Sequence, residues 1–345
     1  MLEKVNLPCA WLAEDLARDN SWVRPFSDDD IAELEEALRY SKSKSLGEQE
    51  VTAADFPLPK LSESLKNVCR DLESGTGVVM LRGFPVEDYS YEDLRRIYWG
   101  MGQHMGSLEC QNTKGEYMQE ITDLGLDYNT DQHRGSMTSA KLRPHCDPTD
   151  VVGLFCIRPA VEGGASTIRS STAIFNEIVE KHPEYLPALY RGFPYDLDGK
   201  APSGDSKEVT HFVPVFSWCE GMVSCRFNQK AIEDGARKIG RPLSKLEQDA
   251  IDFIGNLAID PRFEFAMDFQ PGDIQLLNNY VTLHSREHYI DGDTPETKRL
   301  LLRLWVNHEW ARPLEFRFAN KMLMGARKGV APSVASYELP QRLAS

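Results

Sequence analysis

The sequence lacks any hydrophobic run that could cross a membrane. A membrane-spanning helix needs about 20 consecutive apolar residues, whereas the longest apolar stretches, such as Val151 to Ile157, are only strand-sized. The first residues show no basic region followed by an apolar core, so we expect no secretory signal. Basic residues are also outnumbered, with 39 lysines and arginines against 53 aspartates and glutamates, a net charge of -14. Such an acidic chain suits neither a nucleic-acid nor a membrane partner.

Cysteine is sparse and unpatterned. The seven cysteines are scattered over 345 residues, and none forms a C-x-x-C pair. An odd, scattered set excludes a zinc site built from four cysteines and is typical of reduced thiols. We therefore expect a cytoplasmic protein. The sequence leaves its oligomeric state open, including a homo-oligomer.

Internal repeats and low-complexity tracts are absent, so we expect one domain over residues 1–345. Residues 1–76 are predicted to form a helical layer, with one helix capped by Ser27 and another following Ser62. Residues 77–310 should hold the core, and residues 311–345 a C-terminal extension. A strand is predicted from Gly77, and a further helix begins at Ser90.

From about residue 105 the pattern becomes strand-like, as in a β-sandwich or barrel. Helices are expected from about 172 to 181 and after Ser244, where Glu247 completes a capping box. The polar, glycine-containing segments 123–138 and 196–212 are predicted to be mobile active-site covers. The expected strands are 151–157, 166–169, 222–227, 263–269, 274–277 and 300–306.

A first candidate metal motif is His145-Cys146-Asp147. Side chains at positions i and i+2 of a strand share a face, so His145 and Asp147 could bind one metal ion. The motif is weak alone, because 8 histidines and 53 acidic residues produce H-x-[DE] by chance about once. Lys141 and Arg143 share the strand parity of His145 and Asp147. This polar face predicts a lined pocket, although a solvent-facing edge is the alternative.

A second candidate region lies further along the chain. A Pro-Gly-Asp turn at 271–273 leads into a strand, a bend and then His284. Arg299 and Arg303 follow, with equal parity on an otherwise apolar strand. Two arginines on such a face are costly unless they are paired or bind an anion.

Together these motifs resemble the taurine dioxygenase/TfdA-like family of iron(II)- and 2-oxoglutarate-dependent oxygenases. The family pattern is H-x-D, a long gap, N-x4-H-x-R and an arginine one strand later. Residues 77–84 (GVVMLRGF) and 163–166 (GGAS) also resemble family segments, so the likeness runs from about 77 to 306. The residues that carry the pattern are His145, Asp147, Asn279, His284, Arg286 and Arg299.

The resemblance implies a mainly β fold, a double-stranded β-helix (jelly roll, cupin-like) with helical additions. It also implies iron(II) bound by His145, Asp147 and His284, with 2-oxoglutarate and O2 as cosubstrates. Arg299 matches the arginine that binds the distal carboxylate of 2-oxoglutarate. Ser166 matches a hydroxyl that helps, and Thr167 is its alternative if the turn is shifted. Because a carboxylate is retained at position 147, we do not expect halogenation.

Substrate positions follow from the resemblance as well. Arg303 matches an arginine that binds the substrate's anionic group in taurine dioxygenase. Lys141 and Gln111 stand where the taurine enzyme has asparagine and the family has histidine, which makes taurine an unlikely substrate. Arg226 resembles an arginine on a strand in several relatives, where it could bind substrate or pair with an acidic neighbour.

We therefore predict a dioxygenase that acts as a hydroxylase on an unactivated C–H bond of a small, carboxylate-bearing molecule. The same chemistry could give desaturation, cyclisation or epoxidation, and a peptide substrate is also open. The alternative from another class is a metal-free jelly-roll binding protein.

Overall fold

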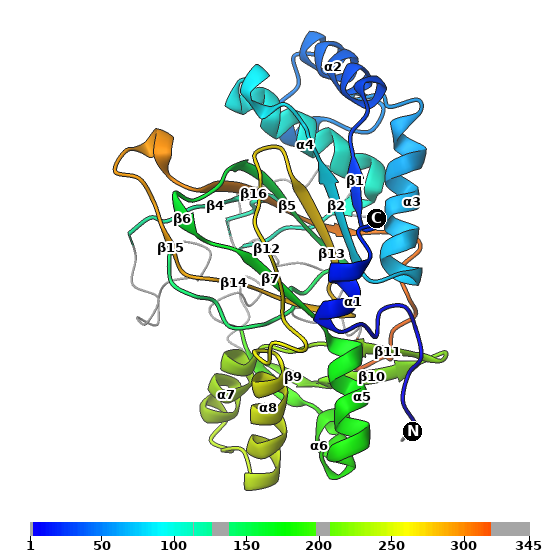
Figure 1. Ribbon diagram of the computed structural model, residues 1–345, viewed down its shortest axis with the longest axis vertical. Coiled ribbons are helices and arrows are strands. Elements are labelled where there is room, and N and C mark those ends of the chain that lie inside the picture. Colours follow the sequence, from blue (N-terminus) through cyan, green and yellow to red (C-terminus); the bar gives the residue numbers. More distant parts are fainter. Residues whose placement is uncertain (1–2, 113, 126–137, 198–207, 319–345) are drawn as a thin grey trace.

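The computed structural model describes residues 3–112, 114–125, 138–197 and 208–318 (Figure 1). The predicted active-site covers, 123–138 and 196–212, lie largely outside these ranges, as does most of the predicted C-terminal extension. No helix among the described residues is long and apolar enough to span a bilayer.

Two β-sheets pack face to face at the centre of the molecule (Figure 1). In the larger sheet the order is β1-β2-β13-β5-β16-β3, and β4 also pairs with β16. Its strands are β1 (Val23–Pro25), β2 (Val78–Arg82), β3 (Ser107–Leu108), β4 (Met118–Ile121), β5 (Val151–Arg158), β13 (Ile274–Asn278) and β16 (Leu300–Asn307).

The smaller sheet has the order β12-β7-β14. Its antiparallel register places His284 opposite Ile168 and Arg286 opposite Ser166. A further short ladder joins β6, which precedes β7 in the chain, to β15, which follows β14. The strands are β6 (Glu162–Gly163), β7 (Ser166–Ser170), β12 (Phe265–Met267), β14 (Thr282–Arg286) and β15 (Tyr289–Ile290).

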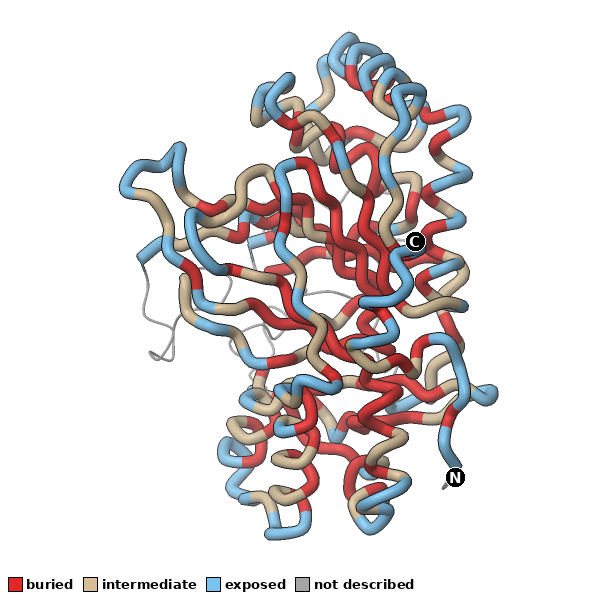
Figure 2. Tube along the Cα trace, viewed as in Figure 1, coloured by how far each residue is buried: buried red, intermediate tan, exposed pale blue. Residues whose placement is uncertain are grey.

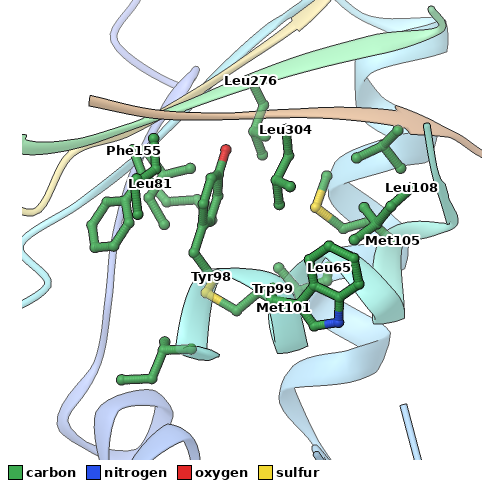
Figure 3. Close-up of a cluster of buried hydrophobic side chains, with 14 of the residues drawn as sticks. Leu65, Leu81, Tyr98, Trp99, Met101, Met105, Leu108, Phe155, Leu276 and Leu304 are labelled. Carbon is green, nitrogen blue, oxygen red and sulfur yellow. The ribbon is translucent and has the colours of Figure 1, made fainter. Parts of the chain in front are cut away.

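Strand alternation gives the large sheet two different faces. The outer face packs on the N-terminal helices, where Tyr98 and Trp99 of α4 (Tyr91–Met105) meet Phe155 and Leu304 (Figure 3). Along each strand, the residues that alternate with those of the outer face point inward. These inward residues, such as Val152, pack against the small sheet. Arg303 and Trp305 of β16 share the parity of this inner face, so the fold directs both toward the space between the sheets.

The N-terminal helices confirm most of what the sequence predicts. Ser27 caps α2 by accepting a bond from Asp30 N, and Ser90 caps α4 in the same way. Their outer sides are exposed while their sheet-facing sides are buried (Figure 2). This layer comprises α1 (Ala13–Arg18), α2 (Asp28–Ser43), η1 (Glu48–Glu50), α3 (Leu61–Ser74), η2 (Val86–Asp88) and α4.

A second group of helices gathers at the other end of the molecule (Figure 1). The sequence predicts α5 (Ser171–Lys181) and α8 (Lys245–Leu257) but misses α6 (Leu186–Arg191) and α7 (Gln229–Lys238). These helices pack with two hairpins into a cluster of their own. The remaining elements are η4 (Pro183–Tyr185), β8 (Phe193–Asp196), β9 (Val209–Val213), β10 (Phe216–Cys219), β11 (Met222–Cys225) and η5 (Pro295–Thr297).

Candidate active site

His145, Asp147 and His284 come together between the two sheets. His284 lies on β14, while His145 and Asp147 lie in the segment that leads into β5. Two backbone bonds join His145 to His284, at 3.0 and 2.8 Å, and the imidazole centroids lie 4.5 Å apart. One ligand atom from each of the three side chains falls within 4.8 Å of the others. This spacing allows all three to bind one metal ion.

The surroundings of His145 fix the orientation of its ring. Its Nδ1 lies 2.8 Å from the carbonyl oxygen of Arg143. Since a carbonyl only accepts, Nδ1 carries the proton, and Nε2 is left with its lone pair for a metal. The backbone N–H of Asp147 donates to Asn279 Oδ1 at 3.0 Å, which holds the carboxylate end of the motif.

Asp147 is held by two donors from β16. Trp305 Nε1 donates to its Oδ2 at 2.8 Å, and Arg303 Nη1 lies 3.3 Å from the same oxygen. Burial alone would raise the pKa of Asp147. The charge of Arg303, reinforced by His284, His145 and the Trp305 bond, outweighs burial and lowers that pKa to about 2. The group is therefore a carboxylate at neutral pH.

His284 is neutral under the same conditions. Burial, and then the neighbouring His145, lower the pKa of His284 to about 3. The site thus offers two imidazoles and one carboxylate without the need to remove a proton from His284 or Asp147. That donor set fits iron(II), which non-haem oxygenases bind with two histidines and a carboxylate while further positions stay open.

Two glutamines hold the guanidinium of Arg303 in place. Its Nε donates to Gln111 Oε1 at 2.7 Å, and its Nη2 to Gln119 Oε1 at 2.9 Å. The Gln111 amide in turn donates to the carbonyls of Tyr117 and Arg303, at 2.8 and 2.7 Å. Gln111, which the sequence assigns to substrate, is completely buried beside Arg303. Its predicted contact with substrate stays a prediction.

A pocket next to the metal cluster is lined by three arginines, Arg286, Arg299 and Arg303. Ser166, Arg286 and Arg299 line it together with His145 and His284. Ser166 Oγ donates to Gln275 Oε1 at 3.0 Å. The apolar part of its lining consists of Ile121, Leu142, Val152, Leu154, Phe269 and Leu301.

Of the two hydroxyls that the sequence leaves open, Ser166 is the one that lines this pocket. Thr167 has the opposite strand parity. Its Oγ1 lies 2.6 Å from Ser285 Oγ and accepts from Arg169 Nη1 at 2.9 Å. Thr167 therefore belongs to a hydrogen-bond network with Ser285 and Arg169 and is not itself among the residues that line the pocket.

The expected polar strand face at 141–147 is wrong. Only His145 of this segment forms β-bridges, with Asn228 and His284. Pro144 has no N–H to donate to a ladder, which accounts for the irregular backbone. Lys141 and Arg143 have half or more of their side chains exposed, and Lys141 Nζ lies 2.8 Å from Glu287 Oε1.

Arg226 follows β11, and its guanidinium lies 5.5 Å from the Tyr195 ring centroid. Neither it nor Lys141 is among the lining residues of the pocket. Their roles in substrate binding stay predictions.

Sequence reasoning missed three residues of the site. Trp305 shares the parity of Arg299 and Arg303, a signal that was available, but its bond to Asp147 depends on the fold. Gln119 stands directly opposite Arg303 in the β4–β16 register, which the sequence does not reveal. Arg286 was recognised in the H-x-R motif but was given no role.

Comparison with known proteins decides the family. The model of the taurine catabolism dioxygenase TauD, TfdA family matches residues 42–305, about three quarters of the chain. The chain belongs to this family. As a TauD/TfdA-family member with the His145–Asp147–His284 cluster in place, it is an iron(II)- and 2-oxoglutarate-dependent dioxygenase. The alternative prediction of a metal-free binding protein is therefore wrong.

Two sequence relatives and one solved structure illustrate the likeness. FR-33289 synthase of Streptomyces rubellomurinus is 29% identical over 88% of this chain and 90% of its own length. The taurine hydroxylase-like protein SAT17 of Stachybotrys chartarum is 26% identical over 87% and 79%. Asparagine oxygenase, solved with Fe(II), 3-hydroxyasparagine and succinate, superposes with a TM-score of 0.66 at 16% identity, covering 90% and 100%. This likeness confirms the jelly-roll fold class.

Proposed function

We propose that this dioxygenase hydroxylates an unactivated C–H bond of a small, carboxylate-bearing molecule, and converts 2-oxoglutarate to succinate and CO2. One observation carries the proposal: His145 and His284 of the metal cluster line the same pocket as the buried guanidinium of Arg299. A 2-oxo acid with a second carboxylate fits this arrangement: its 2-oxo acid end would bind the metal ion, and its second carboxylate would bind Arg299.

Different residues of the site would bind the metal ion and the cosubstrate. His145, Asp147 and His284 would hold iron(II), and Arg299 would bind the distal carboxylate of 2-oxoglutarate through its planar donor fork. Ser166 would support the same carboxylate once its hydroxyl turns from Gln275. Bound iron(II) would supply the activation of dioxygen with 2-oxoglutarate as the reductant. The apolar residues of the lining would help to exclude water from the reacting groups.

The substrate class is argued from chemistry and from relatives. Asparagine oxygenase is a solved neighbour that binds a hydroxylated amino acid. A free amino acid or a similar small carboxylate is therefore the first class to test, with Arg303, Lys141, Gln111 and Arg226 as the proposed contacts. All seven cysteines are free thiols, which supports our proposal of a cytoplasmic protein.

A coupled substrate screen tests this function. Protein with iron(II), 2-oxoglutarate and air is incubated with amino acids and related carboxylates, and both succinate and the organic product are quantified. The expected result is one compound that raises succinate above background and gains one oxygen atom. Asp147→Ala serves as the inactive control. A product that has lost two hydrogens instead would replace hydroxylation by desaturation or cyclisation, and succinate formation that survives in Asp147→Ala would contradict the proposal.

A further inference from the structure

Arg286 is a buried cation in the pocket, and some of its N–H groups have no hydrogen-bond partner among the described residues. It lies on β14, two residues after His284 and on the same face, and is 5% exposed. Its Nη2 donates to the carbonyl oxygens of Thr138, at 2.7 Å, and Ala140. Its Nε and Nη1 have no hydrogen-bond partner among the described residues. A buried guanidinium with two unused N–H groups is costly unless a ligand completes it.

Arg299 lies beside Arg286 and is also buried with an unpartnered N–H group among the described residues. It is 3% exposed, and its Nη1 is unpartnered within the described part of the chain. The two guanidinium groups lie over one ring, 4.7 and 5.2 Å from the centroid of Tyr289. Across the strand pair, Ser166 is the register partner of Arg286. Both arginines and Ser166 line the pocket that contains His145 and His284.

The described carboxylates near the two arginines act only at a distance: Asp291 accepts from the backbone N–H of Arg299, at 2.7 Å, and not from its guanidinium. Neither Arg286 nor Arg299 forms an ion pair with a described acidic residue, whereas Arg303 is matched by Asp147. Two like charges held this close over the Tyr289 ring are costly while no anion lies between them. A bound carboxylate would relieve both the unused N–H groups and the repulsion between the two positive charges. It is negatively charged, and its two oxygens accept several hydrogen bonds.

We propose that Arg286 and Arg299 together bind the distal carboxylate of 2-oxoglutarate, so that Arg286 is a second cosubstrate-binding residue and sets the preference for dicarboxylic 2-oxo acids. This inference rests on the proposed function. It also gives Arg286 a link to the metal site, because the carbonyls that it holds belong to the segment leading to His145.

The test compares two 2-oxo acids of equal chain length. Protein loaded with Mn(II) under argon, without any primary substrate, is titrated by calorimetry with 2-oxoglutarate and with 2-oxopentanoate, which ends in a methyl group. Arg286→Gln should raise the Kd for 2-oxoglutarate by roughly 10- to 100-fold, the range for charge-assisted hydrogen bonds. Its Kd for 2-oxopentanoate should stay within about twofold of wild type, because that ligand makes no use of the arginines.

Two further variants sharpen the result. Arg299→Gln should show the same selectivity, and the double variant should lose less than the product of the single losses, because both residues serve one carboxylate. Arg312→Gln is the matched control: Arg312 is buried and donates to the carbonyl of Val223, but lies outside the pocket lining. It should leave both Kd values unchanged.

The inference is overturned if Arg286→Gln binds 2-oxoglutarate like wild type, as it would if the pair served the primary substrate. It is equally overturned if both acids weaken by the same factor, since Arg286 would then only support the fold. Should Arg286→Gln unfold, Arg286→Lys carries the test, with an expected selective loss of about tenfold. Wild-type protein that binds Mn(II) but neither acid would instead refute the proposed function, and the inference with it.

Discussion

Trp305 Nε1 lies 2.8 Å from Asp147 Oδ2, so the indole of β16 holds the carboxylate of the metal cluster. The same oxygen is approached by Arg303 Nη1 at 3.3 Å. Because both donors come from one strand and reach one oxygen, the carboxylate is oriented before a metal arrives. Groups that orient a metal ligand in this way typically contribute 10- to 100-fold to metal affinity.

Replacing Trp305 by Phe should therefore weaken iron(II) binding by roughly 10- to 100-fold while the ring volume stays nearly filled. Anaerobic titration with iron(II) measures the effect. Trp99→Phe is the matched control, because Trp99 is also buried and donates its N–H, at 2.9 Å, to the carbonyl of Val51, but packs on the outer face of the large sheet. Equal iron affinities in wild type and Trp305→Phe would show that the indole bond does not position Asp147.

Arg303→Met tests whether this arginine serves Asp147. Removing one partner of a buried ion pair leaves the other charge uncompensated, at a cost of about 3 kcal/mol in the free energy of unfolding. The cost should appear in metal-free protein and shrink when Mn(II) is added, because the metal ion replaces the lost positive charge. Urea unfolding with and without Mn(II) measures both values. If Arg303→Met leaves stability unchanged and weakens only the primary substrate, Arg303 is a substrate residue, as the family resemblance implies.

Glu247 should make the fold sensitive to acid. Its burial would raise its pKa, but bonds from Ser244, Arg241 and Arg191 outweigh burial and lower that pKa to about 2, from 4.5. A depressed pKa contributes stability above pH 4.5 that is lost as the pH falls toward 2. Glu247→Gln should thus cost about 1–3 kcal/mol at pH 7, and its difference from wild type should narrow in acid. Chemical unfolding at several pH values measures this, with the exposed Glu14→Gln as control; a difference independent of pH would contradict it.

Much of the fold is readable from the sequence because its signals are local. Caps at Ser27, Ser90 and Ser244 mark three helices, and apolar alternation marks the core strands. The helix α7 (Gln229–Lys238), which follows the predicted strand 222–227, was not predicted. The metal ligands were found through motif spacing, which is readable in one sequence even where the backbone is irregular, as at Pro144 beside His145.

The contacts around the metal ligands could not be predicted in the same way. Gln119 meets Arg303 because β4 and β16 pair in one particular register, and a shift by one residue would turn Gln119 to the other face. Gln111 reaches Arg303 across 192 positions of the chain. Such long-range pairs leave no periodic trace in one sequence, so the sequence could supply the residue types but not their partners.

Anaerobic titration with iron(II) and 2-oxoglutarate, followed by visible absorption, tests the central claim most directly. Chelation of iron(II) by the 2-oxo acid gives a charge-transfer band that neither component gives alone. We expect this band in wild type at one iron per chain, and its loss in His145→Ala, Asp147→Ala and His284→Ala. His182→Ala should retain it, because the similar sequence His182-Pro183-Glu184 lies at the surface, where His182 pairs with Glu184. Formation of the band with wild-type affinity in any of the three ligand variants would contradict the assignment of the metal centre.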